Sequence, residues 1–283
     1  MNNNKGKKIA VLSGKGGTGK TLVSVNLAAL CPNSTYIDCD VEEPNGHLFF
    51  RPEILKEKII TQTRPQIDDN KCNGCKKCVE FCRFNALAYI KKVMVFDDIC
   101  HSCDGCALVC PQKAITMINE EVGKVHFGKS LDTYVKSGFL KVGKISGSPI
   151  ISNLLKNIDE SNYTFIDCPP GSACAVMESI KDADYCILVS EPTIFGACNL
   201  EMVHKLVNVF HKKFGVILNK YTGTNNPSLN YCLKNNIEII GKIPYSNEIA
   251  KLSSVGKIIV RTNSSAKKSF EDILEKVLKK VTK

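Results

Sequence analysis

A glycine-rich segment near the start of the chain has the residue types needed to hold a phosphate group. It fits the pattern G-x-x-x-x-G-K-[ST] and consists of Gly14, Lys15, Gly16, Gly17, Thr18, Gly19, Lys20 and Thr21. Glycines let consecutive backbone N–H groups turn inward around phosphate oxygens. We expect Lys20 to reach the terminal phosphates, Thr21 to ligate Mg²⁺, and Leu22 to complete the site. The segment therefore predicts a site for ATP or ADP with magnesium.

Eight of the fifteen cysteines form two sets with the same spacing, C-x₂-C-x₂-C-x₃-C. The first set is Cys72, Cys75, Cys78 and Cys82, and the second is Cys100, Cys103, Cys106 and Cys110. Paired C-x₂-C also suits zinc, but two triplets each followed by x₃-C favour iron–sulfur clusters. Residues 72–90 and 100–118 end in the similar strings NALAYI and KAITMI, which indicates a duplicated unit.

This spacing resembles that of bacterial ferredoxins with two [4Fe–4S] clusters. The resemblance implies that the fourth cysteine of each set binds the other cluster. The first cluster would then take Cys72, Cys75, Cys78 and Cys110, and the second would take Cys100, Cys103, Cys106 and Cys82. Arg83 follows Cys82 where the ferredoxin pattern has proline, as Pro111 follows Cys110. We expect this departure to alter the local turn, and to shift the potential of one cluster, without removing a ligand.

The elements around these motifs indicate an α/β fold. Residues 8–13 and 34–38 are apolar runs typical of buried strands, and residues 21–30 between them have helical spacing. After about Leu55 cysteines and charges dominate. The α/β pattern then resumes, with expected helices at 148–158, 197–210 and 262–283 and expected strands at 163–167, 184–190, 214–219 and 237–243.

The order of these segments predicts a doubly wound, mostly parallel sheet with an inserted small α+β, bacterial-ferredoxin-like domain. We expect residues 1–62 and 119–283 to form the P-loop domain and residues 63–118 to form the insert. Two independent domains in series are the alternative, but that arrangement leaves residues 1–62 too small to bury a sheet.

Composition bears on the compartment and on possible partners. No apolar run approaches the roughly 18–20 residues that span a bilayer, and residues 1–8 lack the apolar region of a secretory signal. We therefore expect a cytoplasmic protein without membrane contact, whose cysteines bind metal rather than form disulfides. The net charge of +10 raises a nucleic-acid hypothesis, but lysines are spread along the chain and no nucleic-acid-binding motif is present. Two interpretations of this charge remain. The basic residues form an ordinary solvated surface, or they form a docking face for an acidic redox partner.

The early lysine of the glycine-rich segment carries a further resemblance. K-G-G-x-G-K-T, with Lys15 in addition to Lys20, resembles the deviant Walker A motif of the MinD/Mrp/nitrogenase iron protein class. The stretches DCDVEEPN at 38–45 and DCPPG at 167–171 extend the resemblance over nearly the whole chain. In that class the early lysine crosses a dimer interface and compensates transition-state charge. The resemblance implies an ATP-bridged homodimer with catalytic Lys15 and Lys20; the alternative is that Lys15 is merely exposed.

The same resemblance assigns roles to residues that follow strands. Asp40 matches switch I and would position the attacking water and contact the Mg²⁺ shell, whereas Asp38 lies nearer the strand and could be structural. Asp167 matches the Walker B or switch II aspartate and would hold Mg²⁺ through water; a helix cap or turn is the alternative. Asn219 and Pro244 match elements that grip adenine in the class.

Cys174 and the C-terminal segment keep more than one interpretation. Cys174 lies seven residues after Asp167, near the position of a cysteine that ligates a shared cluster in the nitrogenase iron protein. That arrangement needs a second cysteine upstream of the switch, and none lies between Cys110 and Asp167. Three roles of Cys174 therefore stay open. It could bind a metal that bridges two subunits, it could be a transient ligand for a delivered cluster, or it could be an ordinary small residue. The apolar stripe of residues 270–281 favours core packing over membrane binding.

Three functions are compatible with these observations. The first is an ATP-hydrolysing dimer that couples nucleotide state to electron transfer through two [4Fe–4S] clusters to an unidentified partner. The second is an iron–sulfur or other metal cluster carrier or assembly ATPase of the Mrp type, acting on an unidentified acceptor protein. The third is a MinD-like positioning ATPase, for which the insert would be unexplained.

Overall fold

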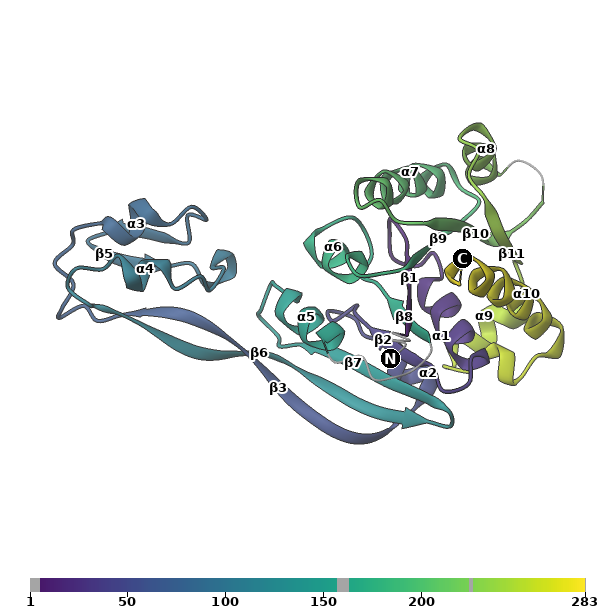
Figure 1. The fold of residues 1–283 in the computed structure, drawn as a ribbon, viewed down its shortest axis with the longest axis horizontal. Coiled ribbons are helices and arrows are strands. Elements are labelled where there is room, and N and C mark those ends of the chain that lie inside the picture. The colour runs from purple at the N-terminus through teal and green to yellow at the C-terminus, as the bar shows by residue number, and fades with distance from the viewer. Residues whose placement is uncertain (1–5, 157–162, 224–225, 283) are drawn as a thin grey trace.

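The chain folds into an α/β body and a small module held away from it by a long two-stranded ribbon (Figure 1). The computed structural model describes residues 6–156, 163–223 and 226–282. The module contains the eight clustered cysteines, and the glycine-rich segment lies in the body.

One mixed sheet forms the centre of the body, with the strand order β11-β10-β9-β1-β8-β2-β7-β6-β3 among the described residues. The strands are β1 (Lys7–Leu12), β2 (Thr35–Asp38), β3 (Glu53–Ile67), β6 (Ile115–Ser130), β7 (Thr133–Leu140), β8 (Tyr163–Asp167), β9 (Tyr185–Ser190), β10 (Phe214–Tyr221) and β11 (Ile239–Pro244). From β11 to β7 all neighbours pair in parallel, and only β6 and β3 add antiparallel pairs. The predicted doubly wound, mostly parallel sheet is confirmed.

Helices cover both faces of this sheet (Figure 1). The helices α1 (Lys20–Leu30) and α10 (Ser264–Val281) pack with the core that contains Ile9 and Val11, and the short η2 (Ile259–Arg261) joins them. The opposite core contains Ala10 and Leu12 and is covered by α5 (Ser148–Lys156), α6 (Cys174–Ile180), α7 (Ile194–Val209) and α8 (Pro227–Lys234). Burial on both faces explains why β1 reads as a continuous apolar run rather than an alternating one.

The C-terminal helix α10 is part of the body. Its buried side chains are Phe270, Ile273, Leu274, Val277 and Val281, which recur at helical spacing and belong to the same core as β1. Each such side chain contributes about 1.5–3 kcal/mol when fully buried. The predicted core packing is confirmed over 264–281, while Lys283 lies outside the described residues. Across the part of the chain that the structure describes, no helix is both long and apolar enough to cross a membrane.

The ribbon consists of β3 and β6, which pair along their whole length from Glu53↔Lys129 to Ile67↔Ile115. Between 123 and 130, β6 also pairs with β7, but from 115 to 122 its described pairing is with β3 alone. The register shifts between Ile60 and Thr61, so that Val122 is an extra residue where the ribbon leaves the body. This ribbon was not expected from the sequence, and the domain boundaries expected at 62/63 and 118/119 both fall within its strands.

The module beyond the ribbon repeats one small unit. It contains α3 (Lys77–Phe81), β4 (Leu87–Ile90), β5 (Lys92–Val95), η1 (Asp97–Ile99) and α4 (Gly105–Leu108). Left-handed backbone conformations recur at equivalent positions of the two cysteine repeats. The pairs are Gly74 with Ser102, Lys76 with Asp104, and Asn85 with Lys113. The backbone therefore follows the same path twice, as the duplicated sequence indicates.

Candidate functional site

The glycine-rich segment forms a tight loop between β1 and α1 at the carboxyl edge of the sheet. Gly19 caps α1 with φ 101°, and a Cβ there would lie 2.1 Å from Asn219 Nδ2. At Gly14 a Cβ would lie 2.5 Å from the carbonyl oxygen of Asn199. Both positions thus require glycine for backbone conformation or close approach. The loop leads directly into the N-terminus of α1, which is the arrangement that binds phosphate.

Asn219 fixes this loop from β10. Its buried side chain donates a hydrogen bond of 2.7 Å from Nδ2 to the carbonyl oxygen of Thr18. The described geometry assigns it to the phosphate loop, and its expected contact with adenine stays a prediction. Pro244 ends β11, is exposed and lies opposite Tyr221 of β10. Its role toward adenine also stays a prediction.

Lys20 and Asp40 meet beside the loop. Lys20 is only 6% exposed, and its Nζ lies 3.8 Å from Asp40 Oδ2. Burial raises the pKa of Asp40 to about 6, since it outweighs the opposing attraction of Lys20, and Asp167 and Glu43 raise this pKa further. A carboxyl group with this pKa is ionised near neutral pH and can accept a proton or a hydrogen bond from water.

Asp167 ends β8 beside Asp38, which ends β2. Tyr36 donates a hydrogen bond of 2.9 Å to Asp167 Oδ2, while Oδ1 of Asp167 is buried and has no hydrogen-bond partner among the described residues. An orphaned carboxylate oxygen is costly to bury, so this atom fits a role toward Mg²⁺ or its water shell. The strand ends therefore bring Asp167 and Asp40 to the same edge as Lys20.

Asp38 has a structural place in this group. Its carboxylate accepts hydrogen bonds from the backbone N–H of Gly46, at 2.8 Å, and of Asp40, at 3.2 Å. Burial and the neighbouring Asp167 raise the pKa of Asp38 well above its usual range. These two bonds hold the turn that carries Asp40 and lead it into α2 (Gly46–Phe50).

Lys15 is held by an acidic residue that the sequence analysis did not identify. Its Nζ lies 2.5 Å from Glu191 Oε1, and Lys220 Nζ lies 3.2 Å from Glu191 Oε2. Burial raises the pKa of Glu191, but hydrogen bonds from Lys15 and Lys220 outweigh it and lower this pKa overall. Glu191 directly follows the apolar strand β9, so its place at the carboxyl edge was a usable signal. Lys15 is half-exposed but paired.

A cavity of about 710 Å³ opens beside the phosphate loop. Its lining comes from three places in the chain. These are Gly17, Gly19, Lys20, Thr21 and Leu22 in the loop and at the start of α1; Asn45, His47, Leu48, Phe49 and Arg51 around α2; and Ser253, Ser254, Val255 and Gly256 at the end of α9 (Asn247–Ser254). This volume lies within the range of small-molecule sites. The last two groups were not expected at this site, because no nucleotide-binding motif marks them and only the fold brings them to the loop.

In the module, the cysteines assigned to the second cluster surround one cavity of about 220 Å³. Cys82, Cys100, Cys103 and Cys106 all line it. Arg83, in the position where ferredoxins have proline, lines it as well. Cys82 thus lies with the second triplet rather than with its own, as the cross-ligation pattern expects. The cluster itself stays a prediction.

The other four cysteines show a related arrangement. Burial raises the pKa of Cys78, and the neighbouring thiols of Cys110 and Cys72 raise it further, so Cys110 lies with the first triplet. Within residues 6–156, 163–223 and 226–282, no three His, Cys, Asp or Glu side chains are grouped as ligands of a single metal ion. A [4Fe–4S] cluster makes a different demand, because each cysteine sulfur binds a different iron. The donor sets fit such clusters.

The remaining cysteines divide by burial. Cys31 and Cys186 are buried in the two cores of the body, as their apolar neighbours in the sequence predict. Cys174 is the first residue of α6 and is exposed. Its possible role as a metal ligand stays a prediction.

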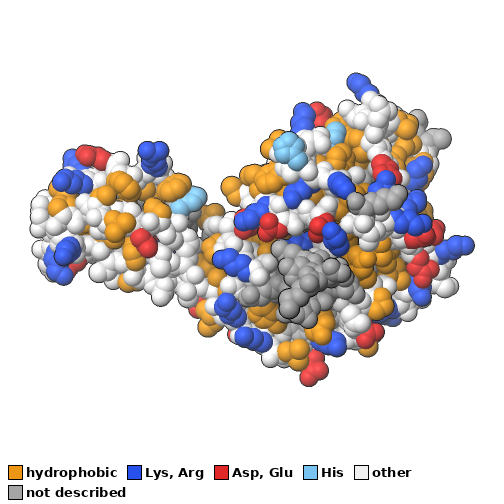
Figure 2. All heavy atoms as spheres, in the orientation of Figure 1, with side chains coloured by type: hydrophobic (Ala, Val, Ile, Leu, Met, Phe, Trp, Pro, Cys, Tyr) orange, Lys and Arg blue, Asp and Glu red, His pale blue; other side chains and the backbone are white. Residues whose placement is uncertain are grey.

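The surface gives no single basic field on the face shown in Figure 2. On this face basic and acidic side chains are both spread over the body and the module. The expectation that this chain does not bind nucleic acid stays a prediction.

Comparison with known proteins identifies the family. The model of the CbiA family, described as the CobQ/CobB/MinD/ParA nucleotide binding domain, matches residues 9–260. An uncharacterised protein of Methanocaldococcus jannaschii is 30% identical over 276 residues, which cover 95% of this chain and 96% of that protein. An iron-sulfur cluster carrier protein of the same organism is 24% identical over 302 residues, covering 97% and 84%.

Solved structures share the fold. The septum site-determining protein MinD of Pyrococcus horikoshii, complexed with Mg-ADP, superimposes with a TM-score of 0.61 at 17% identity over 96% of each chain. This likeness covers the body with its phosphate loop and its mostly parallel sheet. The chain therefore belongs to the CobQ/CobB/MinD/ParA family of P-loop nucleotide-binding proteins.

Proposed function

We propose that this protein is a cytoplasmic, ATP-hydrolysing iron–sulfur protein, in which an ATP-dependent homodimer couples nucleotide state to electron transfer toward a redox partner. One observation carries the proposal. A single chain combines a phosphate loop flanked by Lys20, Asp40 and Asp167 with a cavity lined by four cysteines at the end of a ribbon. Neither half alone requires the other, so their union in one chain points to coupling.

The nucleotide half supports hydrolysis. Lys20 would neutralise charge on the terminal phosphates, and Thr21 and Asp167 would hold Mg²⁺. Asp40 would orient the attacking water, because it is the ionisable carboxylate nearest Lys20, at 3.8 Å. Asn219 holds the loop in place from behind through Thr18.

The dimer follows from Lys15. In the described chain Lys15 pairs with Glu191, which precedes the exposed Ile194 and Phe195 at the start of α7 by three and four residues. An exposed apolar pair that closely follows the partner of a half-exposed lysine suits burial against a second copy of this chain. In the dimer the ion pair of Lys15 with Glu191 would break, and Lys15 would contact the nucleotide bound to the partner subunit. Association upon ATP binding when hydrolysis is blocked tests this step; a chain that stays monomeric contradicts it.

The module half supports redox chemistry. Cys72, Cys75, Cys78 and Cys110 would hold one [4Fe–4S] cluster, and the second set would hold the other, around the 220 Å³ cavity. Such clusters supply reversible one-electron transfer when bound. The chain shields the second site with Phe84 and His101, whose rings stack at 3.8 Å and line that cavity.

An anaerobic titration tests the proposal. The reconstituted full-length protein is reduced, Mg-ATP or Mg-ADP is added, and the electron paramagnetic resonance signal of the clusters is followed. We expect the signal to differ between the two nucleotides. An identical signal, together with loss of clusters to an added apo-acceptor, would reject coupling in favour of a carrier.

The cluster-carrier alternative has its own support. The iron-sulfur cluster carrier protein of M. jannaschii aligns over 97% of this chain. Cys174, exposed at the start of α6, is a donor outside the module that a delivered cluster could use. Against this role, the eight module cysteines supply two sets of four thiolate ligands, and a full ligand set suits permanent binding of a cluster. Replacing Cys174 with Ser separates the two: it should abolish cluster delivery in a carrier and leave the nucleotide-dependent signal intact in a coupled redox protein.

A further inference from the structure

A short segment between β7 and α5 contacts both halves of the molecule. Residues 141–147 form a turn in which Gly143 has φ 84° and Lys144 donates a backbone hydrogen bond to the carbonyl oxygen of Lys141. The segment follows a parallel strand of the sheet, so it starts at the same edge as the phosphate loop. We call it the bridging segment.

One end of the bridging segment contacts the residue after Asp40. The backbone N–H of Leu140 donates a hydrogen bond of 2.8 Å to the carbonyl oxygen of Val41. The side chain of Val41, which is 4% exposed, packs against Gly147: a Cβ on Gly147 would lie 2.3 Å from Val41 Cγ2. Val41 therefore contacts Leu140, the last residue of β7 directly before the segment, and Gly147 at the end of the segment, so that a shift of Asp40 and Val41 would displace the segment.

The same segment contacts the ribbon at its irregular point. The backbone N–H of Lys141 donates a hydrogen bond of 2.9 Å to the carbonyl oxygen of Val122, the extra residue of the β6 bulge. A bulge bends its strand and increases the local twist. Because the ribbon beyond Val122 has no further sheet neighbour among the described residues, a small rotation here swings the module as a whole.

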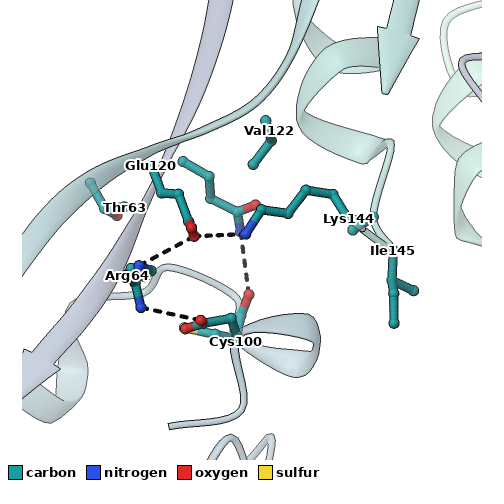
Figure 3. A pocket seen from close by; sticks show the side chains of 10 residues that line it. Thr63, Arg64, Cys100, Glu120, Val122, Lys144 and Ile145 are labelled. Atoms are coloured by element: carbon teal, nitrogen blue, oxygen red, sulfur yellow. Dashed lines mark hydrogen bonds and ion pairs between the residues drawn. The ribbon is translucent and has the colours of Figure 1, made fainter. Parts of the chain in front are cut away.

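A chain of ion pairs continues from the bridging segment to the module (Figure 3). Lys144 Nζ lies 2.7 Å from Glu120 Oε2, and Arg64 Nε lies 3.2 Å from the same oxygen. Figure 3 shows the two cations approaching Glu120 from opposite sides. Arg64 Nη1 lies 3.2 Å from Asp97 Oδ2, in the short helix that ends just before Cys100.

Two further hydrogen bonds fasten the second cysteine loop to the ribbon. Gln62 Nε2 donates to the carbonyl oxygen of Cys100 at 3.3 Å, and the Ser102 hydroxyl donates to the carbonyl oxygen of Thr63. A small pocket between these groups is lined by residues of the ribbon, the cysteine loop and the bridging segment, including Lys144 and Cys100. Bridging segment and second cysteine loop thus face each other directly.

We infer that the bridging segment transmits changes at the nucleotide site to the loop of the second cysteine set, with Lys144 as the positioning residue that joins the two. The inference rests on the function proposed above and names its route. When Asp40 and Val41 shift on ATP binding, the segment shifts with them. The ion pair of Lys144 with Glu120 and the hydrogen bond of Lys141 to Val122 then displace residues 97–103. The first cysteine set has no such contact with the body among the described residues, so the second set responds more.

Hydrogen–deuterium exchange of the reconstituted full-length protein tests this route. Exchange at residues 97–103 is compared with ADP and with a non-hydrolysable ATP analogue in the wild type, in Lys144→Met and in Lys141→Met. Lys141 is the matched control, because its exposed side chain pairs with Glu121 at 3.6 Å and not with Glu120, and because Lys141→Met keeps the backbone hydrogen bond to Val122. Iron content and nucleotide affinity, measured in parallel, should be the same in all three.

We expect the nucleotide-dependent difference at 97–103 to fall roughly fivefold or more in Lys144→Met and to persist in Lys141→Met. A difference that persists in Lys144→Met would overturn the inference and leave the coupling intact. A wild type without any difference at 97–103, but with a nucleotide-dependent cluster signal, would show that coupling uses another route. If the cluster signal does not respond to nucleotide either, the proposed function itself fails.

Discussion

The two candidate sites of this protein are built in opposite ways. The nucleotide site lies on a sheet buried on both faces, and its Asp167 and Lys20 are 0% and 6% exposed. The cysteine module has a small core of Cys78, Leu87, Val93 and Ile115, and its Cys75 and Cys103 are exposed. The first site is positioned by the packing of the body. The second has a small core, so we expect its cysteines to be organised by the clusters that we propose they bind.

The largest expected effect separates catalysis in the body from the module. Asp40→Asn keeps the side chain's size and removes the charge beside Lys20. We expect ATP hydrolysis to fall by about 10²–10⁴-fold, with nucleotide binding and iron content retained. The matched control is Glu43→Gln, an exposed residue of the same segment. Steady-state ATPase assays decide; a rate within a few-fold of the wild type would remove Asp40 from the mechanism.

The next expected effect concerns the module alone. Cys106→Ala removes a ligand from the second cavity, and we expect loss of that cluster and of order in residues 68–114, without a change in the thermal unfolding of the body. Limited proteolysis and iron analysis measure the two consequences. Cys198→Ala, at an exposed position of α7, serves as control. A module that stays protected without iron would contradict the contrast drawn above.

A pH profile probes the buried carboxylates of the body. Because the pKa of Asp40 is raised to about 6, its carboxylate predominates above that pH and its protonated form below it. The kcat/KM for ATP hydrolysis, which reports on the free enzyme, should therefore fall by about tenfold per pH unit below about pH 6. A profile that stays flat down to pH 5 would argue against ionised Asp40 as the working form.

A smaller effect is expected from the support of the phosphate loop. Asn219→Ala leaves the buried carbonyl of Thr18 without its donor, which costs about 1–2 kcal/mol, or roughly tenfold in nucleotide affinity. Asn235→Ala is the control, since that side chain bonds the carbonyl oxygen of Tyr231 at an exposed helix end. Calorimetric titration with Mg-ADP distinguishes them, and equal affinities would show that the loop holds its shape unaided.

The smallest expected effect concerns Arg83, which stands where the ferredoxin pattern has proline. Arg83 lines the second cavity, and a positive charge there favours the more reduced, more negative state of a bound cluster. Arg83→Gln should therefore lower the midpoint potential of the second cluster and leave the first unchanged. Redox titration measures both. A potential that does not move would mean that solvent screens this guanidinium.

Much of the body could be predicted from the sequence, because strands buried on both faces read as continuous apolar runs such as β1 and β9. The phosphate loop was predictable for a related reason: its glycines are required by backbone geometry that tolerates few alternatives. The ribbon was not predictable, because the strand Glu53–Ile67 is charged and largely exposed and lacks a clear alternation. Its pairing with β6 is a long-range contact that local patterns do not encode.

The candidate site follows the same rule. Asp40 and Asp167 were identified because each follows a strand in a recognisable motif. Glu191 follows a strand too, but its partners Lys15 and Lys220 come from distant parts of the chain. The bridging segment was invisible in the sequence for the same reason, since its contacts with Val41, Val122 and Glu120 exist only in the folded protein.

The central claim is that nucleotide state in the body changes the chemistry of the module. Potentiometric titration of the reconstituted protein, once with Mg-ADP and once with a non-hydrolysable ATP analogue, tests it most directly. The account predicts different midpoint potentials for the two nucleotides, with the larger change in the cluster held by Cys82, Cys100, Cys103 and Cys106. Superimposable titration curves, obtained with saturating nucleotide and full iron content, would contradict it.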